Sequence, residues 1–203
     1  MPNFYNLIRA QKFSTSSDNA IEIGPSSSAT PNFAIDAGGK IKWSSGSGNS
    51  DTNIYRSSAG VLKTDNSLTI TGTTTLQQSL EQASLSSTAL TGTVNIDMLS
   101  GAVYYYTSNS SGNFTFNIRG NSSNTLDSLM STGQSLTVVL FCTNSTARNL
   151  SSVTIDTNAT VSTKWFGGSA PSGNANSVDV YTLTIIKTAA STFTVFASQS
   201  KFA

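Results

Sequence analysis

The clearest apolar pattern in the chain covers residues 135–142, Ser-Leu-Thr-Val-Val-Leu-Phe-Cys, where both faces of a strand would carry apolar side chains. A strand that needs cover on both faces lies in the interior of a sheet. Turn-forming residues flank the run, with Gly133 before it and Thr-Asn-Ser at 143–145 after it. The pattern therefore predicts that residues 135–142 form the central strand of a C-terminal domain.

Around this run, residues 93–203 show a series of short strand patterns separated by turn residues. The predicted strands are 94–98, 103–106, 114–118, 135–142, 152–155, 161–166, 178–186 and 192–196. One short helix is predicted at 125–130. Many short strands at this spacing are typical of an antiparallel β-sandwich or a jelly roll. We therefore expect an all-β protein whose C-terminal domain, residues 93–203, is such a sandwich.

Residues 31–75 carry thin pairs of apolar residues between polar turns, which predicts two β-hairpins. The first has a three-residue loop at 37–39, because only this loop length matches the side chains across the hairpin. It places three pairs opposite each other: Asp36 with Lys40, Ile35 with Ile41, and Phe33 with Trp43. The second hairpin turns at 64–66 and would place Leu62 opposite Leu68.

These hairpins hold too little apolar surface to fold alone, since ordering the backbone costs about 1–2 kcal/mol per residue. Copies of the chain would then supply the missing half of the core. We predict a homotrimeric β-rich shaft over residues 31–75, in which equivalent apolar side chains meet around the axis. They are Ile35, Ile41, Trp43, Ile54, Leu62, Leu68 and Ile70.

Residues 76–92 have two interpretations. Leu76, Leu80, Ala83, Ser87 and Leu90 recur at helical spacing and Gly92 would end the helix, which predicts a short helix. The alternative is an irregular linker.

Residues 1–30 have too few apolar residues to fold alone, yet begin with a cluster of them: Phe4, Tyr5, Leu7 and Ile8. Exposed aromatic side chains of this kind mark contact surfaces. We predict an N-terminal attachment arm that docks on another protein; packing on the chain's own trimer is the alternative.

Composition narrows the range of functions. Only 10% of the residues are charged, against about a quarter in a typical globular protein, and the net charge is +1. A nucleic-acid or anionic-membrane partner would need a clustered basic face, which the scattered Lys and Arg residues do not form. No apolar run is long enough to span a bilayer and no signal peptide is recognisable. We expect synthesis in a cytoplasm, and release to any exterior site by assembly or lysis.

The sequence gives no catalytic, cofactor or metal site. There is no histidine and only one cysteine, so Ser-His-Asp chemistry and zinc ligation lack their residues. Cys142 ends the most apolar run and is interpreted as a buried hydrophobic residue. Asp127 and Asp156 could form a glycosidase pair only if the fold brought them together. The Tyr104–Tyr106 triplet is interpreted as core plus edge rather than as a sugar platform.

Two parts of the chain resemble small virion structural proteins of tailed phages, particularly cyanophages. One is Asn53-Ile54-Tyr55-Arg56 with the segment Gly60–Gly72, similar to a repeated motif of phage fibre and tail proteins. The other comprises residues 165–171, 174–188 and 193–202, which resemble a C-terminal domain of those proteins.

The resemblance implies a non-enzymatic component of the exposed virion surface, commonly trimeric, with an N-terminal attachment region and a distal C-terminal domain. Its partners would be other capsid or tail proteins, and a host cell-surface glycan or protein. The region before the shaft is shorter than the docking domain of a full tail fibre, which favours a short fibre, a knob or a decoration protein. A purely architectural decoration role is the alternative function, and a polysaccharide hydrolase is the third.

Overall fold

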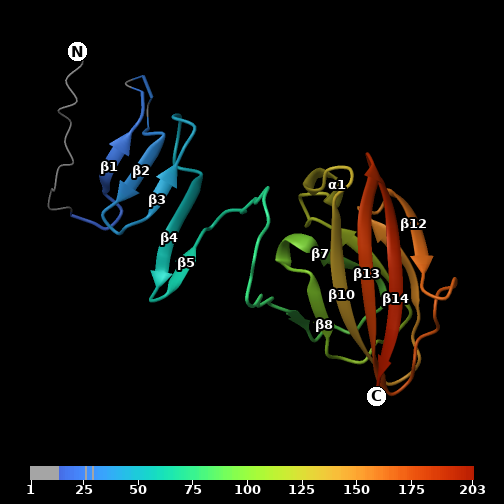
Figure 1. The fold of residues 1–203 in the computed structure, drawn as a ribbon. Coiled ribbons are helices and arrows are strands. Elements are labelled where there is room, and N and C mark those ends of the chain that lie inside the picture. Colours follow the sequence, from blue (N-terminus) through green and yellow to red (C-terminus); the bar gives the residue numbers. More distant parts are fainter. Residues whose placement is uncertain (1–13, 26, 29) are drawn as a thin grey trace, which may run out of the picture. The chain divides into compact units, whose positions relative to one another are not determined.

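The computed structural model describes residues 14–25, 27, 28 and 30–203 (Figure 1). The attachment candidates Phe4, Tyr5, Leu7 and Ile8 lie outside the described residues. The protein is all-β, as predicted, with 46% of its residues in strands and 4% in helices. It divides into two compact units, Met1–Leu76 and Gln77–Ala203.

The N-terminal unit is a single five-stranded sheet in which each strand is antiparallel to the next. Its strands lie in the order β1-β2-β3-β4-β5. They are β1 (Asn19–Ile23), β2 (Phe33–Asp36), β3 (Ile41–Trp43), β4 (Thr52–Ser58) and β5 (Val61–Lys63). Sequential strands joined by turns need no crossover, so this sheet forms from local contacts alone.

The first predicted hairpin is confirmed in position and in register. Phe33 lies opposite Trp43 and Ile35 opposite Ile41 in the β2–β3 pair. Gly39 supplies the left-handed residue of the loop, with φ of 83°. The Asp36 carboxylate accepts a hydrogen bond from the Lys40 amide at 2.8 Å, which fixes the turn.

The second predicted hairpin is wrong. Strand β5 turns back on β4 at Ala59-Gly60, where Gly60 has φ of 73°, and Leu62 lies opposite Arg56. The turn forms there because Gly60 tolerates a left-handed backbone, whereas 64–66 (Thr-Asp-Asn) contains no glycine. Leu68 lies in no strand.

The helix prediction for residues 76–92 is also wrong, and the alternative of an irregular linker holds only for residues 76–83. Residues 67–82 form neither helix nor strand. Strand β6 (Ser84–Ser86) pairs with β8 (Val103–Tyr106), and β7 begins at Gly92. Leu76 and Leu80 are 66% and 93% exposed, whereas Leu90 is 1% exposed in the C-terminal core. Serine and threonine side chains compete for the backbone hydrogen bonds that a helix needs, which disfavours a helix in this segment.

The C-terminal unit has two sheets with the core between them, and from Ser84 to Trp165 successive strands alternate between the two (Figure 1). The six-stranded sheet has the order β12-β14-β13-β10-β8-β6, and the three-stranded sheet has the order β11-β9-β7. The remaining strands are β7 (Gly92–Asp97), β8 (Val103–Tyr106), β9 (Phe114–Arg119), β10 (Ser135–Asn144), β11 (Leu150–Ile155), β12 (Thr160–Trp165), β13 (Ser177–Ala189) and β14 (Thr192–Phe202). The two helices are a 3-10 turn at Met98–Ser100 and α1 (Leu126–Leu129), which falls within the predicted helix.

The antiparallel prediction for this domain is wrong in its strand directions. The three-stranded sheet is entirely parallel, and in the six-stranded sheet only β13 opposes its neighbours. Alternation between two sheets returns the chain to each sheet in the same direction, so successive strands pair in parallel. The predicted strands are present; their short spacing does not reveal which sheet each one joins.

Strand β10 is an interior strand, as predicted, pairing with β13 on one side and β8 on the other. Its inward residues Val138, Leu140 and Cys142 are fully buried, so Cys142 is the buried hydrophobic residue expected. Burial raises the pKa of the Cys142 thiol, which keeps it protonated and unreactive. The outward residues Val139 and Phe141 are only partly buried. Within one chain, therefore, only the inward face of β10 is fully covered.

In the parallel sheet, side chains of the same type lie opposite one another on neighbouring strands. Ile96, Ile118 and Ile155 lie opposite each other on β7, β9 and β11, and all are fully buried. On the opposite face Asn117 donates to Asn95 Oδ1 at 2.8 Å and accepts from Thr154 Oγ1 at 3.1 Å. These apolar and polar ladders hold the parallel strands in register.

Candidate functional site

Four of the predicted trimer-axis residues lie on one face of the N-terminal sheet. Ile35, Ile41 and Ile54 form a cross-strand row, and Trp43 lies on the same face. Residues directly opposite each other in antiparallel strands point to the same side, so the row continues through β1 and β2. We call this surface the apolar face; it comprises Ile21, Ile23, Phe33, Ile35, Ile41, Trp43 and Ile54.

The apolar face has no complete cover within the part of the chain that the structure describes. None of its seven side chains is buried; Trp43 is 39% exposed and Ile23 61% exposed. Phe33 and Trp43 pack edge-to-face with ring centroids 5.9 Å apart. A one-layer sheet with one apolar face needs a second layer to bury it.

The other three predicted axis residues do not join the apolar face. Leu62 lies in β5 and is 71% exposed, while Leu68 and Ile70 lie in the irregular segment 67–82 and are 74% and 51% exposed. Sequence reasoning also missed Ile21, Ile23 and Phe33 as members of the face. The alternation of Ile21-Glu22-Ile23 was the available signal, since it predicts a strand with both isoleucines on one side.

The opposite face of the same sheet is charged. Lys42 pairs with Asp36 at 3.4 Å, and Lys63 pairs with Asp65 at 3.0 Å. Hydrogen bonds from Lys63 and the Tyr55 hydroxyl hold the pKa of Asp65 well below its usual range. The sheet therefore carries apolar side chains on one face and paired charged side chains on the other.

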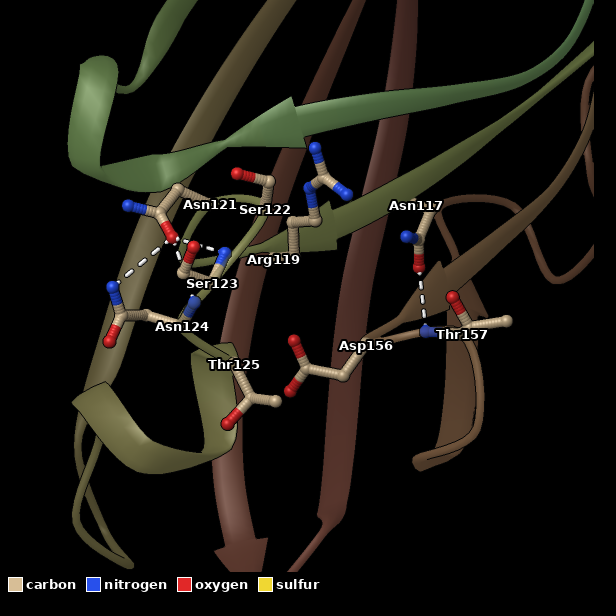
Figure 2. Close-up of a pocket in the computed structure, with 9 residues that line it drawn as sticks. All are labelled: Asn117, Arg119, Asn121, Ser122, Ser123, Asn124, Thr125, Asp156 and Thr157. Carbon is tan, nitrogen blue, oxygen red and sulfur yellow. Dashed lines mark hydrogen bonds between the residues drawn. The ribbon is translucent and has the colours of Figure 1, made fainter.

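In the C-terminal unit a polar pocket lies beside the end of the three-stranded sheet (Figure 2). It encloses about 220 Å³ and is lined by Asn117, Arg119, Asn121, Ser122, Ser123, Asn124, Thr125, Asp156 and Thr157. Arg119 Nε donates to Asp97 at 2.6 Å, which raises the pKa of the guanidinium. A pocket of this size, with amide, hydroxyl and charged groups, suits at most one small polar unit.

The carboxylates of Asp156 and Asp127, near this pocket, make contacts that stabilise the fold. Asp156 accepts hydrogen bonds from the Leu126 and Asp127 amides at 2.7 and 2.9 Å and so caps α1. The Asp127 carboxylate instead pairs with Lys187 at 2.7 Å, and this contact with Lys187 is the main cause of its lowered pKa. The fold thus brings Asp156 to the Asp127 backbone, but a carboxyl of lowered pKa is a poor general acid near neutral pH.

A second recess, the aromatic groove, lies by β12, β13 and β14. It encloses about 510 Å³ and is lined by Lys164, Trp165, Phe166, Thr182, Thr184, Phe196, Ala197 and Ser198. Phe166 is 87% exposed and Phe196 is 51% exposed. Aromatic rings beside hydroxyl groups form an apolar surface with polar groups at its edge. Such a surface suits a ligand that is partly apolar and partly polar.

The Tyr104–Tyr106 triplet forms core and outer face as expected. Tyr104 and Tyr106 are 8% and 6% exposed in the core. Tyr105 points outward and packs edge-to-face on Phe141 at 5.8 Å. It therefore belongs to the outer face of the six-stranded sheet rather than to the aromatic groove.

Three further findings bear on function. Among residues 14–25, 27, 28 and 30–203 no group of three potential metal-ligating acidic or cysteine side chains is found. The two short helices of that same part of the chain are far from the length needed to cross a bilayer. No protein-family model, curated protein or solved structure matches this chain.

Proposed function

We propose that the protein is a non-enzymatic structural component of a tailed-phage particle. In this proposal it is a homotrimeric short fibre or knob on the exposed virion surface, attached through its N-terminal arm and displaying its C-terminal unit. The observation that carries the proposal is the incompletely covered apolar face of the N-terminal sheet. Such a face favours association, whereas the C-terminal unit already encloses its own core.

The energetics favour association of copies over an isolated N-terminal unit. Fully burying an aliphatic or aromatic side chain contributes about 1.5–3 kcal/mol, and each copy offers seven partly exposed ones. Electrostatic repulsion between copies opposes this association only slightly, because the charged pairs of the sheet lie on its other face. Threefold packing of the apolar face would supply the second layer that each sheet lacks.

Host-surface binding is assigned to the C-terminal unit through the aromatic groove. Exposed Phe166 and Phe196 could stack on the apolar face of a sugar ring, and Thr182, Thr184 and Ser198 would accept or donate to its hydroxyls. A neutral host-envelope glycan is the ligand class that this chemistry suits best.

The test uses the purified full chain and fluorescently labelled host cells. Phe166→Ala with Phe196→Ala should reduce cell binding at least about tenfold, as expected for losing roughly 1.4 kcal/mol of stacking. Leu85→Ala is the matched control, because Leu85 is 72% exposed outside the groove. No binding by the parent protein at high concentration would instead favour an architectural decoration role.

Attachment is tested separately on the particle. Replacing Phe4 and Tyr5 by alanine should leave the C-terminal unit folded and lower the amount of protein incorporated into virions, measured by quantitative blotting. Incorporation equal to that of the parent would remove the docking role of the arm. Release of reducing ends from host polysaccharide by the intact protein would overturn the non-enzymatic assignment.

A further inference from the structure

Residues 67–82, the linker between the two units, have no backbone partner within the described chain. The linker forms no helix or strand, and none of its N–H or C=O groups is hydrogen-bonded to another described residue. Figure 1 draws it as irregular chain that follows β5. A connection of this length without secondary structure is uncommon inside a compact domain and is typical of a functional loop or of a linker between domains.

The large apolar side chains of the linker all fall at even positions, although four other even positions carry small or polar residues: Gly72, Thr74, Gln78 and Gln82. Every odd position from 67 to 81 is hydroxyl, amide or acid: Ser67, Thr69, Thr71, Thr73, Thr75, Gln77, Ser79 and Glu81. Every large apolar residue is at an even position: Leu68, Ile70, Leu76 and Leu80. All four are more than half exposed, from 51% for Ile70 to 93% for Leu80.

A period of two is the signature of a β-strand with one face buried. The placement of its large apolar residues thus fits an amphipathic strand, but the residues that the structure describes supply neither a neighbouring strand nor cover for its apolar side. An unpaired extended segment of this kind is a template for pairing with another chain.

We propose that residues 67–82 form an intermolecular seam with the same segment of two further copies of this chain. The inference rests on the proposed homotrimer and names a contact within it. The even positions, with Leu68, Ile70, Leu76 and Leu80, face the threefold axis, and the odd positions face water.

Charge and symmetry both favour the same segment as the occupant. Glu81 is the only charged residue of the segment, and its odd position keeps it away from the axis. Cyclic symmetry runs the three copies in the same direction, so each apolar residue meets its own equivalents. The β-branched threonines at 69, 71, 73 and 75 suit an extended conformation.

Disulfide cross-linking of the full chain tests the seam, because the native Cys142 is fully buried and gives a low background. Leu76→Cys should form covalent dimers under mild oxidation at least about tenfold faster than Thr75→Cys, since only axis-facing Cβ atoms come within disulfide reach. Leu80→Cys and Ser79→Cys form a second matched pair. A dimer plus a free chain is the expected product of three thiols around one axis.

Two measurements on the unmodified protein keep the test decisive if a variant fails to assemble. Light scattering gives the mass, and hydrogen exchange reports whether amides 67–82 are protected. A mass of three chains with protected amides supports the seam. A trimer with unprotected amides and equal oxidation at even and odd positions overturns the seam and leaves the trimer; a monomer overturns both.

Discussion

Asn117 holds together the polar ladder of the C-terminal unit, so its replacement by alanine should weaken that unit specifically. The side chain is 3% exposed and lies on the central strand of the parallel sheet. It donates to Asn95 at 2.8 Å and accepts from Thr154 at 3.1 Å and from the Thr157 amide at 2.8 Å. Thr157 has φ of 65°, an unusual conformation that the last bond helps to hold.

The magnitude follows from these three bonds. All three partner residues are at least partly exposed, so water can replace some of what is lost. The net value of about 0.5–1.5 kcal/mol per bond therefore applies rather than the full penalty of a buried orphan group. Asn117→Ala should cost about 2–4 kcal/mol, whereas Thr115→Ala, which removes one exposed hydroxyl contact to Ser152, should cost less than about 1 kcal/mol.

The assay is urea unfolding of residues 77–203, a unit that encloses its own core. Trp165 is the one tryptophan in this unit, so its fluorescence reports this unit alone. With a slope of about 2 kcal/mol per M urea, Asn117→Ala should lower the midpoint by about 1–2 M. A midpoint shift no larger than that of Thr115→Ala would refute the reasoning that the ladder stabilises the parallel sheet.

Two further predictions concern assembly and acid stability. Trp43→Ala should weaken the proposed trimer more than Trp165→Ala does, measured by sedimentation at micromolar concentration. Trp43 lies on the apolar face, whereas Trp165 packs on Tyr181 in the C-terminal core with ring centroids 6.5 Å apart. Equal dissociation of the two variants would contradict this placement. The lowered pKa of Asp127 means that its pairing with Lys187 stabilises the fold above the unfolded pKa of about 3.9, and that this stabilisation is lost as the pH falls through the folded value. Asp127→Asn should therefore reduce the fall of the urea midpoint as the pH drops below about 4. If the midpoint of this variant falls with pH as steeply as that of the parent, other carboxyl groups cause the loss of stability in acid.

The sequence predicts strands well and their partners poorly. Alternating and continuous apolar runs located β8, β9, β10 and β13 within a few residues, because period-two patterning depends only on neighbouring residues. Strand direction depends instead on which sheet each strand joins. Because the pairing of Ile96 with Ile118 and Ile155 spans distant segments, local pattern alone could not reveal a parallel sheet.

In the candidate surfaces, too, features that depend on neighbouring residues were predictable and features that depend on tertiary structure were not. The β2–β3 register was predictable, because a glycine-containing loop and matched side chains across it leave one solution. The aromatic groove was not, since Phe166 and Phe196 lie on separate segments that only tertiary structure brings together. Asp156 as the cap of α1 was likewise hidden, because its partners are at Leu126 and Asp127.

The linker shows how a helical spacing and a strand spacing can coexist in one segment. Leu76 and Leu80 are four residues apart, which fits one turn of a helix and also two full periods of a strand. Leu68 and Ile70 break the ambiguity, because residues two apart lie on the same face only in a strand. The four large apolar residues of the linker would therefore share one side of a strand, and a symmetric seam would bury that side. In that arrangement the C-terminal unit folds on its own core, while the apolar face and the linker acquire theirs only when three chains meet.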